Sequence, residues 1–386
     1  MDSKKEKRKS AIVSLLFFAS VVVISFFGGI AAVDAVDAYA EQYGGNFLLY
    51  LLIFLFGVYL ISFLQVVAHE LGHLIFGLIS GYRFCSFRVH SLMLLRRGGK
   101  LCFARQRIAG TAGQCLMAPP EPDENGRIPS VLFNLGGVIM NFFLSAVFAA
   151  LYFVCRPHPI GLVFLLAAAI GLLMVLTNGI PLRLSMVDND GRNALSLGKD
   201  PHALHAFYMQ LKVNAEITSG VRLADMPEEW FTLAPDADTN NALIATIRVF
   251  ACNRILDRHE FEQAQAAIRA LLDEKSGCIA LHKNLLICDL ISLLIGSGRE
   301  DEALSYLTKE QKNFMRLMRT FPSVIRTEYL IAKYITKDAV MTKKQAEAFA
   351  RVSRRYPYPQ DLITDRALML LPETKKEEEG AAGTIV

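Results

Sequence analysis

Long apolar runs without charge dominate the first half of the chain. No Asp, Glu, Lys or Arg occurs in residues 11–33, 47–68, 131–154 or 160–182. Each run is close to the roughly 20 residues that a helix needs to cross a bilayer, where it satisfies its own backbone hydrogen bonds. The pattern predicts a mainly α, polytopic membrane protein with about four transmembrane helices, the second extending over residues 47–80.

The first run, residues 11–33, has two interpretations. It follows a basic segment at residues 4–9 and precedes small residues near 31–38, as in a cleaved signal peptide. Its apolar part is longer than the roughly 7 to 15 residues of a signal-peptide core, which favours an uncleaved anchor. Residues 1–46 are therefore expected to form a cytoplasmic basic segment, a membrane anchor and an external loop.

The second half has denser charges and apolar positions at helical spacing. Asp200-Pro201 has the residue types of an N-cap and a first helical position, and amphipathic stretches separated by short breaks follow it. We predict a cytosolic all-α domain over residues 200–372. Residues 255–260 resemble residues 294–299, so a tetratricopeptide-like array and a plain helical bundle both fit. The tail 373–386 is predicted to be disordered.

Composition fits a membrane protein better than a soluble enzyme. The chain is 53% hydrophobic and 20% charged, whereas soluble proteins have about 25% charged residues. The net charge of +4 is too balanced to indicate a nucleic-acid partner. The seven cysteines include no CxxC pair and are predicted to be buried thiols.

The basic and acidic residues are separated among the loops. Lys and Arg are concentrated in residues 4–9 and 83–127, whereas the segment 34–41 contains Asp34, Asp37 and Glu41 and no basic residue. Basic loops stay on the cytoplasmic side of a membrane. We expect a multi-pass protein of the cell membrane whose N-terminus, 82–130 loop and C-terminal domain are all cytoplasmic.

The second apolar run ends in His69-Glu70-Leu71-Gly72-His73. Histidines at positions i and i+4 lie on one face of a helix and can bind one zinc ion, while the intervening Glu can act as a general base toward the bound water. Because these polar side chains adjoin an apolar run, where they are costly to bury without coordination, the segment predicts a Zn²⁺ site.

Two further segments contain candidate partners for this site. Asn178 lies near the end of the fourth run, and Asp190 lies in the segment that follows that run. The Asp can supply a third zinc ligand or can simply belong to a surface turn. Gly137 and Asn141 lie one helical turn apart in the third run. That pair fits either support of the metal site or close packing of helices.

The motifs in this order resemble the site-2 protease family of intramembrane zinc metalloproteases. The resemblance rests on HExxH in one transmembrane helix, GxxxN in the next, and N-x-x-P followed by Asp-Gly in a third, and it covers roughly residues 47–195. It implies hydrolysis of peptide bonds in or near transmembrane segments of membrane proteins or precursor peptides. It also implies zinc ligands His69, His73 and Asp190, the general base Glu70, and the supporting residues Asn141, Asn178 and Gly137.

One spacing departs from the family pattern. Eight residues, 182–189, separate Pro181 from Asp190, whereas the family usually has about four. Asp188 is therefore an alternative third ligand. Gly191, which follows Asp190, favours Asp190.

Residues 84–117 are predicted to form a membrane-associated β-hairpin, with its turn at Arg97-Gly98-Gly99-Lys100. In the resembling family such a hairpin offers an edge strand to an unwinding substrate. Its arginines also fit contact with anionic lipid headgroups. The helical domain is expected to bind a cytosolic protein partner.

Two rival functions remain at the level of sequence. An inactive scaffold of the same fold could recruit partners through its C-terminal helices, although a scaffold has no need of Glu70. A metal transporter is the other rival, but spans with so few polar residues provide no evident ion path.

Overall fold

We describe the fold from a computed structural model, which describes residues 19–22, 29–30, 32–156, 158–181, 189–197 and 200–382. The chain divides into two compact units. The first comprises residues 1–77 and 130–196, and the second comprises residues 78–129 and 197–386. The segment between the second and third spans, where the sequence predicts a β-hairpin, thus belongs to the same unit as the C-terminal helices.

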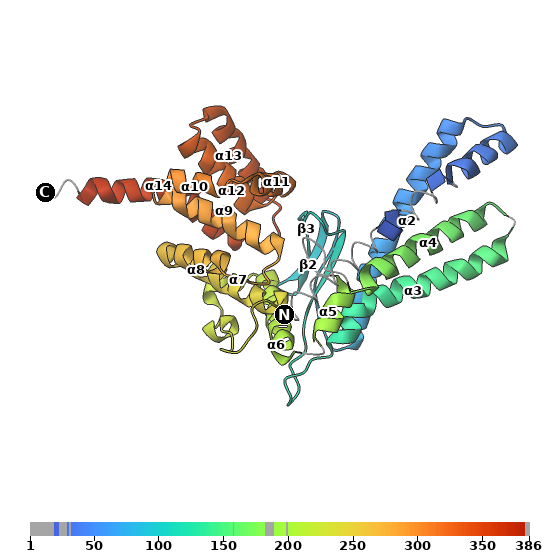
Figure 1. Ribbon diagram of the computed structural model, residues 1–386, viewed down its shortest axis with the longest axis horizontal. Helices are drawn as coiled ribbons and strands as arrows, with labels where there is room; N and C mark the ends of the chain where they lie inside the picture. Colours follow the sequence, from blue (N-terminus) through green and yellow to red (C-terminus); the bar gives the residue numbers. More distant parts are fainter. Residues whose placement is uncertain are drawn as a thin grey trace. The chain divides into compact units, whose positions relative to one another are not determined.

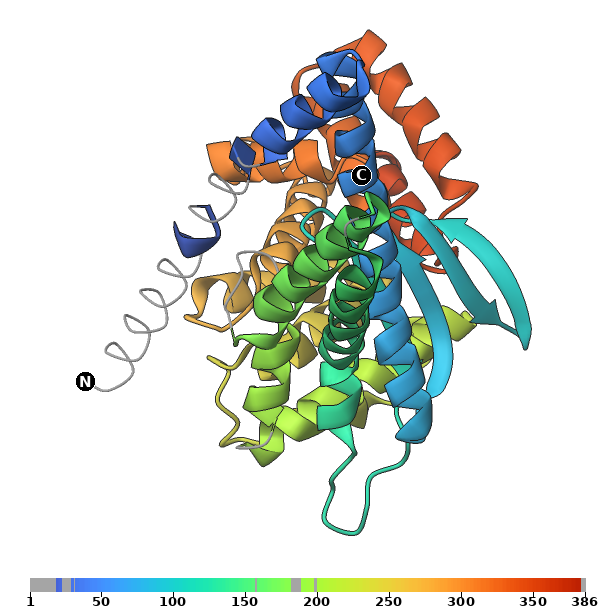
Figure 2. The ribbon, with the colours of Figure 1, turned by 90° about the vertical axis from the view of Figure 1, so that its right-hand side faces the viewer.

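The first unit contains three helices that are long and apolar enough to cross a membrane, counted over the described residues. They are α2 (Phe47–Ile79), α3 (Ser130–Cys155) and α4 (Ile160–Gly179), followed by the short α5 (Asp190–Leu197). Helices α3 and α4 lie side by side (Figures 1 and 2). The predicted spans agree with these helices to within a few residues, and α4 ends before Pro181, which cannot continue a helix. The first predicted span lies largely outside the described residues.

The second unit begins with a four-stranded antiparallel sheet of order β3-β2-β1-β4. Its strands are β1 (Arg83–Val89), β2 (Leu92–Arg97), β3 (Lys100–Arg105) and β4 (Gly113–Ala118). The turn at Gly98-Gly99 is as predicted, with both glycines at positive φ. The rest of the predicted hairpin is wrong: the segment 84–95 folds back on itself at His90, whose φ of 52° makes the turn, and β4 adds a fourth strand.

The sheet has one covered and one open face in the second unit. Alternate residues of β2, Met93 and Leu95, are each 1% exposed, whereas Leu101 and Phe103 on the edge strand β3 are 63% and 89% exposed. Helix α6 (Pro201–Ser219) contacts β1, β2 and β4. Asp200 caps α6 by accepting a hydrogen bond from the backbone N–H of His202, as its sequence predicts.

The remaining helices follow α6 in short steps. They are the 3₁₀ turns Leu223–Asp225 and Glu228–Phe231, α7 (Ala242–Asp257), α8 (Phe261–Asp273), α9 (Ala280–Gly296), α10 (Glu300–Ser305), α11 (Lys309–Leu317), α12 (Pro322–Leu330), a π-helical turn (Ile331–Ile335), α13 (Ala339–Ser353) and α14 (Asp361–Ala382). The related segments 255–260 and 294–299 each span the end of the first helix of a helix pair, α7 with α8 and α9 with α10. Helix α14 continues to Ala382, through the segment where composition predicts disorder.

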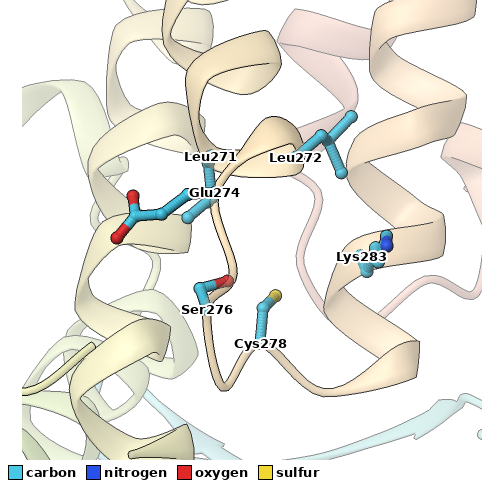
Figure 3. A pocket seen from close by; sticks show the side chains of 6 residues that line it. All are labelled: Leu271, Leu272, Glu274, Ser276, Cys278 and Lys283. Carbon is cyan, nitrogen blue, oxygen red and sulfur yellow. The ribbon is translucent and has the colours of Figure 1, made fainter. Parts of the chain in front are cut away.

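A buried ionic group lies in the core of this helical array. Arg326 donates to Asp289 at 2.6 Å and to Asp365 at 2.5 Å, and its side chain is 2% exposed. A small pocket between α8 and α9 is lined by Leu271, Leu272, Glu274, Ser276, Cys278 and Lys283 (Figure 3). The carboxylate of Glu274 already accepts hydrogen bonds from Arg248 and Thr239. Burial raises the pKa of the Cys278 thiol to about 11. Neither the carboxylate of Glu274 nor the thiol of Cys278 is therefore in a reactive state.

The start of α14 predicts a pH dependence of stability. Burial and the nearby carboxylates of Asp365 and Asp257 raise the pKa of Asp361 to about 8. The folded state therefore holds a proton that the unfolded chain loses near pH 4, so this carboxyl makes stability fall as pH rises from about 4 to about 8.

Asp361→Asn is expected to remove that pH dependence. The variant should melt about 2–4 °C higher than the wild type at pH 8, for a gain on the order of 1 kcal/mol, and the difference should vanish near pH 4. Thermal unfolding of the full chain in detergent at both pH values measures it. A variant that melts lower than the wild type at pH 8 would contradict the assignment.

Candidate metal centre

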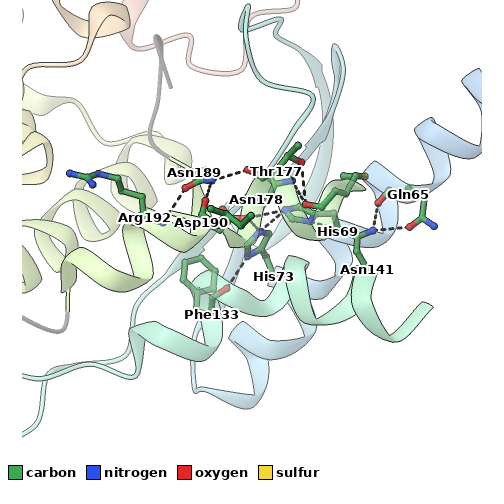
Figure 4. Close-up of polar contacts among 12 residues, drawn as sticks. Gln65, His69, His73, Phe133, Asn141, Thr177, Asn178, Asn189, Asp190 and Arg192 are labelled. Carbon is green, nitrogen blue, oxygen red and sulfur yellow. Dashed lines mark hydrogen bonds and ion pairs between the residues drawn. The ribbon is translucent and has the colours of Figure 1, made fainter. Parts of the chain in front are cut away.

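The HExxH segment lies in the last third of α2, where the apolar helix becomes buried on one side. His69, Glu70 and His73 are all less than 9% exposed, whereas leucines earlier in the helix, such as Leu48 and Leu52, are more than half exposed. The two imidazoles share one face of the helix, as the i, i+4 spacing predicts (Figure 4).

Three potential ligand atoms converge at this face. Asp190 Oδ2 lies 3.0 Å from His69 Nε2 and 3.4 Å from His73 Nε2, and the two Nε2 atoms are 3.2 Å apart. Ligands about 2.0–2.1 Å from a tetrahedral zinc ion are about 3.3–3.4 Å from each other. The triangle therefore has the dimensions of one face of a zinc coordination tetrahedron, and among the described residues it is one group whose side chains could hold a metal ion.

Hydrogen bonds on the far side of each ring select the tautomer that a metal requires. His73 Nδ1 donates to the backbone oxygen of Phe133 at 2.8 Å. His69 Nδ1 donates to Asn141 Oδ1 at 2.7 Å. Since both Nδ1 atoms carry the proton, both Nε2 atoms keep a lone pair directed at the site.

Asp190 is placed by the junction between two helices. It is the first residue of α5 and follows Asn189, whose Oδ1 accepts the backbone N–H of Arg192 and caps the helix. The amide of Asn189 also donates to the backbone oxygens of Thr177 and Ile180 at the end of α4, at 2.8 and 2.6 Å. Sequence reasoning missed Asn189, although its position just before a helix start is a recognisable signal.

The glycine after Asp190 is needed for this junction. A Cβ atom on Gly191 would collide with the backbone oxygen of Gly179. Burial alone would raise the pKa of Asp190, but without a metal ion the rings of His69 and His73, when protonated, donate to its carboxylate and hold that pKa well below its ordinary range. The carboxylate is therefore charged, and a cation can take the place of the ring protons.

The other predicted residues take separate positions. Asn141 is fully buried and contacts His69 directly, which brings it into the site. Asn178 donates to the backbone oxygen of Met174 at 3.0 Å, within its own helix. Asp188 lies outside the described residues.

Small residues allow α2 and α3 to meet at the site. Gly72 and Gly136 face each other, and a Cβ on Gly136 would be 2.7 Å from the backbone oxygen of Gly72. A Cβ on Gly137 would be 2.6 Å from the His69 ring. The glycine of the predicted GxxxN pair thus provides the space for a ligand side chain.

Gly137→Ala should displace His69 and weaken metal binding. We expect zinc affinity to fall about 10- to 100-fold, the range seen when the support of a ligand is lost. Chelator competition on the purified full chain measures this. Gly57→Ala in α2 is the control, because a Cβ there meets nothing within 4 Å. Equal zinc affinity of the two variants would refute the assigned role.

Comparison of the chain with protein-family models, with curated proteins and with solved structures finds no match.

Proposed function

We propose that this protein is an intramembrane zinc metalloprotease of the site-2 protease type. The observation that supports it most directly is the triangle formed by the half-buried Asp190 with the buried His69 and His73, which lie at the end of an apolar helix with Glu70 within the same turn. The three apolar helices of the first unit provide the membrane setting.

The donor set fits zinc. Two neutral imidazoles and one carboxylate are a typical set of three protein ligands for a catalytic zinc ion, which leaves a fourth position for water. When bound, the ion polarises the scissile carbonyl and lowers the pKa of that water toward about 7. Asn141 and the Phe133 carbonyl hold the two rings in the required orientation.

Glu70 is the proton carrier in this proposal. It takes the proton from the attacking water and passes it to the nitrogen of the leaving amine, so that the cleaved chain departs as a neutral amine. Its position next to His69 in the chain and its burial, at 7% exposure, support this role.

The substrate is a membrane-embedded protein or a precursor peptide. A transmembrane helix hides its carbonyls in its own hydrogen bonds, so the segment must unwind before it can be cleaved. Substrates with Gly, Pro or Asn in their spans meet this requirement most easily. The edge strand β3 offers a place to bind the unwound segment by strand addition.

The sheet also has the composition of a surface for anionic lipids. Residues 83–118 contain seven Arg and Lys and no Asp or Glu. The exposed Leu101 and Phe103 lie among these cations on β3. Basic residues near apolar side chains attract a negatively charged bilayer surface.

The proposal also includes a topology. The arginine-rich loops and both termini lie in the cytoplasm, where the helical domain binds a protein partner.

Metal analysis and membrane proteomics test the proposed function together. The purified full chain should contain one zinc per chain. Cells with the wild type should lack membrane-embedded fragments that accumulate when Glu70→Gln replaces it. Addition of a chelator should stop cleavage of such a fragment by the purified protein, and zinc should restore it. A purified protein without zinc, or cleavage that survives metal removal, would refute the proposal.

A further inference from the structure

A second buried amide lies behind Asn141. Gln65 is on α2, one turn before His69, and is only 3% exposed although the surrounding helix is apolar. A buried amide in an apolar span is costly unless its polar atoms find partners. Both ends of the Gln65 side chain have partners, on two different helices.

The contacts of Gln65 join the three apolar helices. Its Nε2 donates to the backbone oxygen of Ala167 on α4 at 2.9 Å. Its Oε1 accepts from Asn141 Nδ2 on α3 at 2.7 Å, and its backbone oxygen accepts from the same nitrogen at 3.1 Å. Figure 4 shows the three side chains, with Asn141 between Gln65 and His69.

The direction of this chain of hydrogen bonds is set by backbone oxygens. A carbonyl oxygen can only accept, so Ala167 requires the NH₂ end of Gln65. The oxygen end of Gln65 is then left for Asn141, which must present its own NH₂ to Gln65 and its oxygen to His69. Because Asn141 Oδ1 accepts, His69 Nδ1 must carry the proton, and the lone pair stays on Nε2.

The opposite orientation would prevent metal binding. If the NH₂ group of Asn141 faced His69, the ring would accept at Nδ1 and carry its proton at Nε2, where the metal ligand is needed. Gly171 supports the observed arrangement, because a Cβ there would be 2.8 Å from Gln65 Nε2. Space for the Gln65 amide is therefore built into α4.

We propose that Gln65 is a positioning residue for the metal centre, which fixes the amide orientation of Asn141 and thereby the tautomer of His69. This inference rests on the proposed function, since it assumes that the three ligand atoms bind zinc. It assigns Gln65 a role beyond holding the helices together, and the two roles have different consequences.

Zinc affinity and the visible spectrum of a cobalt-substituted protein distinguish a role of Gln65 in orienting the site from a role in holding the helices together. Gln65→Met keeps the length of the side chain but removes both side-chain hydrogen bonds, so that only the longer 3.1 Å contact with the backbone oxygen of residue 65 still orients Asn141. In the purified full chain in detergent, we expect it to lower zinc affinity about 10- to 100-fold and to change the visible absorption of bound Co²⁺. Gln65→Glu, which as a protonated acid can still donate to Ala167 and accept from Asn141, should restore wild-type values.

Ser145→Ala is the matched control. Ser145 is a buried hydroxyl on α3, one turn beyond Asn141, and its Oγ has no hydrogen-bond partner in the described structure. Its loss should leave zinc affinity and the Co²⁺ spectrum unchanged. If Gln65→Met fails to fold, Gln65→Asn, which is too short to bridge both helices, should show the same loss of affinity.

The outcomes separate the two proposals. Wild-type affinity and an unchanged Co²⁺ spectrum in folded Gln65→Met or Gln65→Asn would overturn the role of Gln65 and leave the protease proposal intact. An equal loss in Ser145→Ala would also overturn it, because any buried polar change would then suffice. A wild-type protein that binds neither metal would remove both proposals.

Discussion

Glu70→Gln should abolish peptide-bond cleavage while the protein keeps its zinc. The amide has the size of the carboxylate but cannot take a proton from water, and general-base catalysis contributes about 10²- to 10⁴-fold to a rate. We expect a loss of at least that size in the cleavage rate of a substrate identified by proteomics. Zinc content should stay at one per chain, because Glu70 is not one of the three converging ligands.

Glu124→Gln, a change of an exposed carboxylate in the loop before α3, is the control and should leave the rate unchanged. Cleavage at the wild-type rate by Glu70→Gln would rule out the proposed mechanism. Loss of zinc from Glu70→Gln would instead make Glu70 a metal ligand and require a different base.

Asp190→Ala should remove most of the zinc. Structural zinc sites bind with about 10–16 kcal/mol over four ligands, or about 3 kcal/mol for each, which corresponds to a loss of about 10²-fold or more in affinity. The measurement is zinc per chain after dialysis against a buffered chelator. Folding of the variant can be followed by its thermal transition.

Asp188→Ala decides between the two candidates for the third ligand. The geometry places Asp190 Oδ2 against both histidines, so Asp188→Ala should keep its zinc. The reverse result, with zinc retained by Asp190→Ala and lost from Asp188→Ala, would show that the longer spacing after Pro181 has moved the ligand to the earlier aspartate.

Local patterns were sufficient for much of the site. That His69 and His73 lie side by side on one helix face could be predicted from the sequence, because the i, i+4 spacing on a helix is fixed by helix geometry alone. Gly137 and Asn141 could be singled out because a glycine and an amide are conspicuous in an apolar run. Their contacts with His69 confirm that this pair faces α2.

The sheet shows where local patterns failed. The glycine pair at residues 98–99 predicted a turn, but the turn at His90 has no such signal, since a histidine is an uncommon residue at positive φ. Strand β4 was missed because its residues alternate weakly and because two other strands separate it in the sequence from its pairing partner, β1. Long-range pairing of this kind is not encoded in either strand by itself.

The sequence by itself determined which segments are apolar enough to span a membrane, where the helical domain begins, and which histidines can share a metal ion. These depend on hydrophobicity and helical periodicity, which act over one or two turns. The tertiary structure decided that the carboxylate of Asp190 lies against the two histidines, and how it is held there. Asp190, Asn189 and Gln65 meet their partners only where separate helices approach at glycines, and such crossings depend on the shapes of both surfaces at once.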